Sequence, residues 1–156
     1  MVRVLWVLVV LVALWCGWWA LAAFGFSSSI QAWFEERRAE GWQAEVSEIA
    51  TAGFPTQVTA RLRDVNLADT TNGVVVGLDQ LDLSFRAIWP GDMWVTAPQT
   101  PIRLATPQGQ WLIETVNGQA DLNLHPGSTL ELEYMSFASD VLEVSDTQGE
   151  ALMQSG

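Results

Sequence analysis

The hydrophobic and polar positions divide the chain into an apolar start, a short helix-like segment and a long segment with strand-like alternation. The apolar start contains an uncharged stretch, Val4–Phe26. A helix of that length is about 34 Å long, enough to cross the ~30 Å hydrocarbon core of a bilayer. We therefore predict that residues 1–26 form a cytoplasmic tip and a single transmembrane anchor.

Residues 27–41 have the pattern of a second, short amphipathic helix. Ser27–Ser29 are suitable residues to cap its start, and Gly41 is a typical helix stop. Residues at one-turn spacing lie between them: Ile30, Trp33, Phe34 and Arg37. Two interpretations stay open. The helix has a solvated charged face, or it lies on the membrane with Trp33 and Phe34 among the lipid headgroups.

After Gly41 the hydrophobic period changes from helical to two, which indicates β-strands. The alternating runs are residues 57–63, 81–86, 120–124, 130–134 and 141–144. Turn signals separate them, at residues 71–73, 89–92, 106–109, 117–118 and 125–127. Residues 42–156 are therefore predicted to form a mainly antiparallel sheet, a curved meander with one apolar face. Val58, Ala60 and Leu62 should share that face with Leu81, Leu83 and Phe85.

The orientation of the anchor depends on the lengths of the flanking segments. A cleavable signal peptide is the competing interpretation, because Ala20–Ala22 resembles a processing site. The long, unbroken apolar stretch favours an uncleaved signal anchor. Arginines occur on both sides, but only a short tail precedes the span while the acidic body follows it. We predict a single-pass protein of the bacterial inner membrane, with a cytoplasmic N-terminus and a periplasmic C-terminal domain.

Two sets of residues in and near the anchor are candidates for contacts. A strip of small side chains recurs at helical spacing and would let the backbone of another helix approach closely: Ala13, Cys16, Gly17, Ala20 and Ala23. Aromatic residues are candidates for the membrane interface: Trp18, Trp19, Trp33 and Phe34. The ordinary composition of membrane helices also explains the small strip, so both interpretations stay open.

Composition removes several classes of function. The chain has 7 basic residues, all arginine, against 18 acidic residues, and its net charge of -11 argues against binding to nucleic acid. With one cysteine, Cys16, and one histidine, His125, a disulfide framework within one chain or a site built from several such ligands is ruled out. Nucleotide-binding and hydrolase motifs are absent. We predict no catalytic residue, metal or cofactor, and no enzymatic activity.

Short motifs resemble a bacterial inner-membrane family known as domain of unknown function 2125. The resemblance rests on Ile49–Pro55, on the strand that ends in Leu62–Leu67, on Trp33 and on Met93–Pro98. It covers most of residues 1–105 and implies that the chain corresponds to the N-terminal half of a family member. The family is similar in layout to AsmA-like envelope proteins, which implies a membrane helix before a curved sheet with an apolar groove and a role in lipid transport.

Two functions are compatible with these features. The first is a membrane-anchored periplasmic binding or scaffold module without enzymatic activity, with lipids as candidate ligands. The alternative is an accessory single-span subunit of a larger inner-membrane complex, respiratory or photosynthetic, held by partner membrane helices. The lipid bilayer is the expected partner in both cases.

Overall fold

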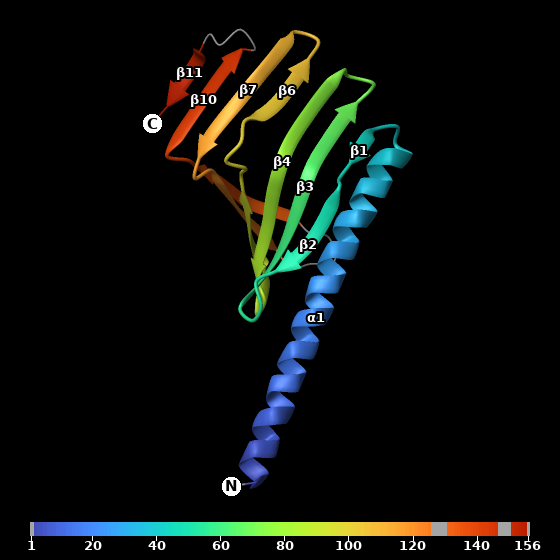
Figure 1. Cartoon of the computed structure of the whole chain (residues 1–156), viewed down its shortest axis with the longest axis vertical. Helices are drawn as coiled ribbons and strands as arrows, with labels where there is room; N and C mark the ends of the chain where they lie inside the picture. Colours follow the sequence, from blue (N-terminus) through green and yellow to red (C-terminus); the bar gives the residue numbers. More distant parts are fainter. Residues whose placement is uncertain (1, 126–130, 147–150, 156) are drawn as a thin grey trace.

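The computed structural model describes residues 2–125, 131–146 and 151–155, and these form one long helix and one sheet of 11 strands (Figure 1). The helix is α1, Val2–Ala39. The strands of the first half are β1 (Gln43–Glu45), β2 (Glu48–Ala52), β3 (Gln57–Asp69), β4 (Val74–Arg86) and β5 (Trp89–Thr96). Those of the second half are β6 (Ile102–Thr106), β7 (Gly109–Val116), β8 (Gln119–His125), β9 (Glu131–Ala138), β10 (Val141–Asp146) and β11 (Ala151–Ser155). The predicted fold class, a long apolar helix followed by a curved antiparallel sheet, is confirmed.

The predicted break between a membrane helix and a separate amphipathic helix at residues 27–41 is wrong, because α1 runs through this region without interruption. Ser27 does not cap a new helix. Its hydroxyl donates to the carbonyl of Phe24 at 3.0 Å, and the Ser29 hydroxyl donates to Gly25 at 2.9 Å. Serines inside a helix can bond to the preceding turn in this way. The amphipathic segment is therefore the upper part of one continuous helix.

The predicted stop at Gly41 is confirmed. Gly41 has a φ of 93°, a left-handed conformation that glycine adopts without a steric penalty. Its N–H donates to Arg38 O, and the Trp42 N–H donates to Arg37 O, both at 3.0 Å. These two bonds form a Schellman motif, which satisfies carbonyls at the helix end and turns the chain back toward the sheet.

The β3–β4 hairpin is the central element of the sheet, with 13 residues in each strand. Its register confirms the predicted apolar face. Val58 lies opposite Phe85, Ala60 opposite Leu83, and Leu62 opposite Leu81. The turn predicted at residues 71–73 joins the two strands, whereas residues 89–92, predicted as a turn, belong to β5. The change of direction comes two residues earlier because Ala87 and Ile88 form the turn.

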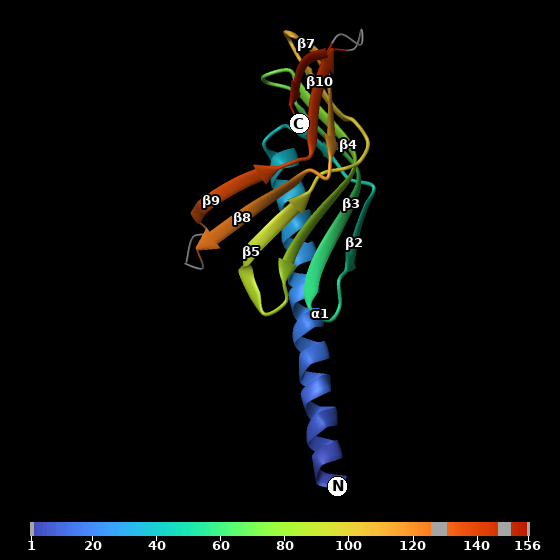
Figure 2. The ribbon, with the colours of Figure 1, turned by 90° about the vertical axis from the view of Figure 1, so that its left-hand side faces the viewer.

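The sheet divides into two branches at β4, so the strand order departs from a simple meander (Figure 2). The C-terminal part of β4 pairs with β5, which continues to β8 and β9. The N-terminal part of β4 pairs with β6, which continues to β7, β10 and β11. The chain crosses between the branches where the Ala97 N–H donates to Gly118 O at 2.8 Å and the Asp140 N–H donates to Val116 O at 3.0 Å.

The core lies between α1 and the β1–β4 part of the sheet, in two clusters. The upper cluster of buried residues is Ile30, Phe34, Ala44, Ala60, Leu62 and Val65. The lower cluster is Ala23, Val58, Phe85 and Ala87. Phe26 contacts both clusters and packs edge-on against Phe85, with ring centroids 4.9 Å apart. Helix and sheet therefore form one packed body, and the residues of α1 before Trp15 extend beyond it (Figure 1).

Candidate functional site

The most distinctive feature of the described surface is an apolar cavity of about 360 Å³ between α1 and the sheet. The helix contributes five side chains at spacings of three and four residues, which place them on one face. They are Phe26, Ser29, Ile30, Trp33 and Phe34. The cavity therefore begins at Phe26, where the uncharged stretch of the helix ends.

The sheet contributes the other wall through β3, β4 and β5. Its lining residues are Leu62, Val65, Leu67, Leu78, Leu81, Leu83 and Met93. Strict alternation would turn Val65 away from the cavity, because it lies three positions after Leu62. Between them, Asp64 has a φ of 48°. Beyond Asp64 the alternation is shifted by one position, a change of phase that turns Val65 toward the cavity.

The phase change occurs in both strands of the hairpin at the same height. Leu78 and Leu81, on β4, also lie three residues apart and line the same cavity. Val65 is paired with Leu78 and Leu62 with Leu81, so both strands change phase together and the register is kept. The Ser47 hydroxyl holds Asp64 by donating to its Oδ2 at 2.8 Å. As a result, the apolar wall continues along the whole hairpin.

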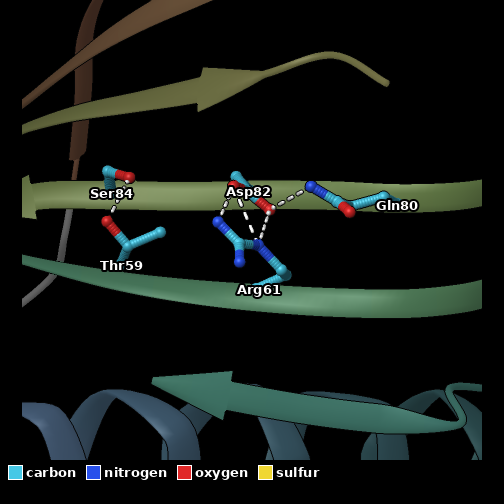
Figure 3. A network of polar contacts seen from close by, with 5 residues as sticks. All are labelled: Thr59, Arg61, Gln80, Asp82 and Ser84. Atoms are coloured by element: carbon cyan, nitrogen blue, oxygen red, sulfur yellow. Dashed lines mark hydrogen bonds and ion pairs between the residues drawn. The ribbon is translucent and has the colours of Figure 1, made fainter. Parts of the chain in front are cut away.

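Polar groups of the hairpin lie on the opposite face of the sheet (Figure 3). Arg61 binds Asp82 through Nη2 and Oδ2 at 3.1 Å, and Gln80 donates to Oδ1 of Asp82 at 3.1 Å. The hydrogen bonds and charge of Asp82 raise the pKa of Arg61. Thr59 and Ser84 share a buried hydroxyl bond of 2.9 Å.

Among the described residues that line the cavity, none is charged, and Ser29 is the one with a hydroxyl group. Buried charges need a partner to offset their desolvation, and this lining offers none. The arrangement therefore suits an uncharged, apolar ligand rather than a polar substrate.

The structure separates the predicted strip of small residues. Ala13, Cys16, Gly17 and Ala20 are exposed, and a Cβ added at Gly17 would meet no atom within 4 Å. Ala23 instead belongs to the lower core cluster and is 4% exposed. Ala23 is therefore used within the chain, whereas the other four residues are free to contact another helix.

The residues predicted for the membrane interface also have different environments. Phe34 is 3% exposed and lies in the upper core cluster, so it is not available to lipid headgroups in this structure. Trp33 is 43% exposed, and Arg37 lies over its ring at 5.7 Å from the centroid. Trp18 and Trp19 lie where α1 meets the lower end of the sheet.

Three tryptophans of α1 donate their indole N–H groups to backbone carbonyls in or next to two turns of the sheet. Trp15 donates to Pro55 O in the β2–β3 turn at 3.1 Å, and Trp19 donates to the carbonyl of Gln57, the first residue of β3, at 2.8 Å. Trp18 donates to Ala87 O in the β4–β5 turn at 3.0 Å. Sequence analysis missed these contacts because the partners are far apart in the chain. The one sequence feature that points to these contacts is the helical spacing of Trp15, Trp18 and Trp19, three and four residues apart.

A metal centre would need several ligating side chains close together. Among the described residues, no group of three or more His, Cys, Asp or Glu side chains could hold a metal ion. The side chain of His125 lies outside the described part of the chain. Asp69 closes the β3–β4 turn, where it accepts from Asn72 Nδ2 at 2.6 Å and from the Thr71 N–H at 2.9 Å.

Comparison with known proteins places the chain in a family. Neither the curated proteins nor the solved structures contain a significant match. A match was found with a family described as uncharacterized proteins conserved in bacteria, DUF2125, over residues 19–153. The match extends well beyond residue 105, where the resemblance seen in the sequence ended. It includes the upper part of α1, both walls of the cavity and both branches of the sheet. The chain therefore belongs to the bacterial family DUF2125.

Proposed function

We propose that this protein is a membrane-anchored, non-enzymatic module that binds the acyl chain of a lipid in the cavity between α1 and the sheet. The observation that carries the proposal is the apolar lining of the cavity, which begins where the uncharged stretch of α1 ends. Its volume of about 360 Å³ is within the range of small-molecule sites, roughly 300–1,000 Å³. An acyl chain that leaves the membrane along α1 would stay in apolar surroundings.

The helix-facing side of the sheet extends the apolar surface beyond the cavity. Two rows of paired residues cross from β4 to β9: Phe85, Met93, Leu122 and Met135, then Leu83, Val95, Ala120 and Phe137. At the end of these rows, Met135 is 58% exposed and Phe137 is 50% exposed. Exposed apolar residues that continue a lined cavity are typical of interaction surfaces. This surface supports the proposal that the ligand is a lipid longer than the cavity alone would hold.

We further propose that α1 spans the bacterial inner membrane, with the N-terminus in the cytoplasm and the sheet in the periplasm. The helix is long and apolar enough to cross a membrane, and its 18-residue window of highest hydropathy is exposed in the structure. The short tail before the span and the acidic body after it favour this orientation. The resemblance in layout to AsmA-like envelope proteins agrees with a role in lipid handling.

The test compares lipid binding by two tryptophan variants of α1. Ser29→Trp fills the cavity from the helix side, whereas Gln31→Trp adds the same bulk at an exposed residue of α1 outside the cavity lining. The full chain is extracted in mild detergent and its bound lipid is measured by native mass spectrometry. Wild type and Gln31→Trp should carry lipid, and Ser29→Trp should lose most of it. Equal lipid in all three, or none in wild type, would refute acyl-chain binding.

The alternative, an accessory subunit of a larger membrane complex, is favoured by the exposed strip Ala13, Cys16, Gly17 and Ala20. Four small residues on a free helix surface allow close approach of a second helix. The same extraction distinguishes the two functions. Migration of the protein alone with lipid supports the binding module, whereas co-migration with a large complex supports the accessory subunit.

A further inference from the structure

Two turns lie at the lower end of the sheet, next to α1 (Figures 1 and 2). Large apolar side chains in or next to these turns are exposed. In the β2–β3 turn, Phe54 is 54% exposed. In the β4–β5 turn, Ile88 is 76% exposed and Trp89, the first residue of β5, is 53% exposed. These three residues form what we call the apolar tips. Turns in water usually carry polar residues or glycine, so large apolar side chains are unusual at this place.

The height of the apolar tips along α1 is set by the tryptophan hydrogen bonds described above. The indole N–H groups of Trp15, Trp18 and Trp19 donate to carbonyls in or next to these turns, at distances of 2.8–3.1 Å. The Trp19 ring also packs edge-on against Phe54, with centroids 5.4 Å apart. The tips therefore lie beside residues 15–19 of the helix, inside the uncharged stretch Val4–Phe26.

The length of the helix below this point is too short to cross a bilayer. Twelve residues, Val4 to Trp15, separate charged Arg3 from the height of the tips, and they rise about 18 Å. A hydrocarbon core is ~30 Å thick, and a thin one is about 27 Å. With Arg3 at the far interface, the near boundary therefore falls roughly 9–12 Å above Trp15. Tilting the helix would place the tips still deeper.

We infer that Phe54, Ile88 and Trp89 insert into the lipid leaflet on the sheet side of the membrane. The inference rests on the membrane-spanning helix of the proposed function, and it adds that part of the sheet is embedded. The lower end of the cavity, at Phe26, then lies close to the membrane surface. Lipid would not have to cross water to reach it.

The hydrogen bonding of the turns supports this inference independently. Within hydrocarbon, a backbone carbonyl without a partner costs several kcal/mol. Pro55, Gln57 and Ala87 each have a carbonyl that accepts an indole N–H, and the Thr56 carbonyl accepts the Ala87 N–H at 3.0 Å. These four carbonyls are thus satisfied within the chain. Arg86, the last residue of β4, directly precedes the β4–β5 turn. Its long cationic side chain can extend toward the lipid phosphates.

The experiment measures the depth of single spin labels in the full chain, reconstituted in vesicles of phosphatidylcholine and phosphatidylglycerol. Cys16→Ser provides the background, and cysteine is introduced at one position at a time: Phe54, Ile88, Leu11 and Gln108. Phe54 and Ile88 report the two turns, Leu11 reports the middle of the span, and Gln108 reports the exposed β6–β7 turn. Collision rates with oxygen and with a water-soluble nickel chelate give the depth. Circular dichroism checks that each variant folds, and the two tip positions lie in different turns, so either one tests the inference.

We expect lipid-like collision rates at Phe54, Ile88 and Leu11, and water-like rates at Gln108. Water-like rates at both tips with a lipid-like rate at Leu11 would overturn the inference and leave the membrane anchor intact. A water-like rate at Leu11 would instead refute the spanning helix and the inference together. Neither result bears on whether the cavity holds lipid, because the Ser29→Trp comparison measures that separately.

Discussion

At the scale of single residues, the two faces of β4 differ in what they tolerate. Leu83 lines the cavity, and Asp82 next to it pairs with Arg61 on the other face. Leu83→Asp places a carboxylate in an apolar lining and should lower the free energy of unfolding by about 1–3 kcal/mol. Asp82→Asn weakens a partly exposed ion pair and should cost about 0.2–1 kcal/mol. Denaturant unfolding in detergent checks both, and similar losses would contradict the assigned faces.

The turn carboxylate of Asp69 makes stability depend on pH. The side-chain hydrogen bond from Asn72 and the backbone N–H groups of Thr71 and Asn72 lower the pKa of Asp69. Because the folded-state pKa is the lower one, the stabilisation is complete above the unfolded-state pKa. It is lost as the pH falls through the folded-state value.

We therefore expect the wild type to lose more stability than Asp69→Asn as the pH falls below about 4, near the usual pKa of aspartate. The asparagine still accepts hydrogen bonds but does not titrate at this position. The midpoint of thermal unfolding, measured against pH for both proteins, provides the comparison. Parallel curves would show that the Asp69 bonds do not contribute.

At the scale of elements, the tryptophan contacts attach α1 to the sheet. Trp19→Phe keeps a ring next to Phe54 but leaves the Gln57 carbonyl without its indole donor. Because this hydrogen bond is exposed in the structure, we expect a loss of about 0.5–1.5 kcal/mol, the net contribution of a typical hydrogen bond. Trp6→Phe is the matched control, because Trp6 is 65% exposed. If both variants unfold alike, the indole bond is not a significant attachment.

The exposed side of α1 permits a direct test of the accessory-subunit alternative. Gly17→Leu adds bulk where the chain itself offers free space, so the variant should fold normally. If a partner helix packs there, the loss of about 1–2 kcal/mol should weaken co-purification roughly tenfold. Leu11→Val should have no effect. Unchanged recovery of every co-purifying component with Gly17→Leu would remove the main support for this alternative.

At the scale of the whole molecule, the orientation in the membrane is open to a labelling experiment. Cysteine replaces Gln108 in the β6–β7 turn, on a Cys16→Ser background. A membrane-impermeant thiol reagent should label it in cells with a permeable outer membrane, because we place the sheet in the periplasm. Labelling only after lysis of the inner membrane would reverse the orientation.

Much of the molecule follows from local patterns in the sequence. The uncharged stretch Val4–Phe26 predicted the exposed apolar helix, and Gly41 predicted its end. Alternation predicted the faces of the β3–β4 hairpin, because side chains in a strand have a period of two. Even the phase change has a trace in the sequence, since Leu62–Val65 and Leu78–Leu81 both break the alternation by one position. These features depend on residues that are neighbours in the chain.

Contacts between distant segments decided the rest. Ser27–Ser29 have the composition of a helix start, yet α1 continues through them because Phe26, Ile30 and Phe34 pack on the sheet on either side of this segment. The branching at β4, the cavity and the tryptophan bonds join residues that local periodicity does not relate. Burial of apolar surface and satisfaction of backbone carbonyls select these arrangements, and both depend on which elements meet in space.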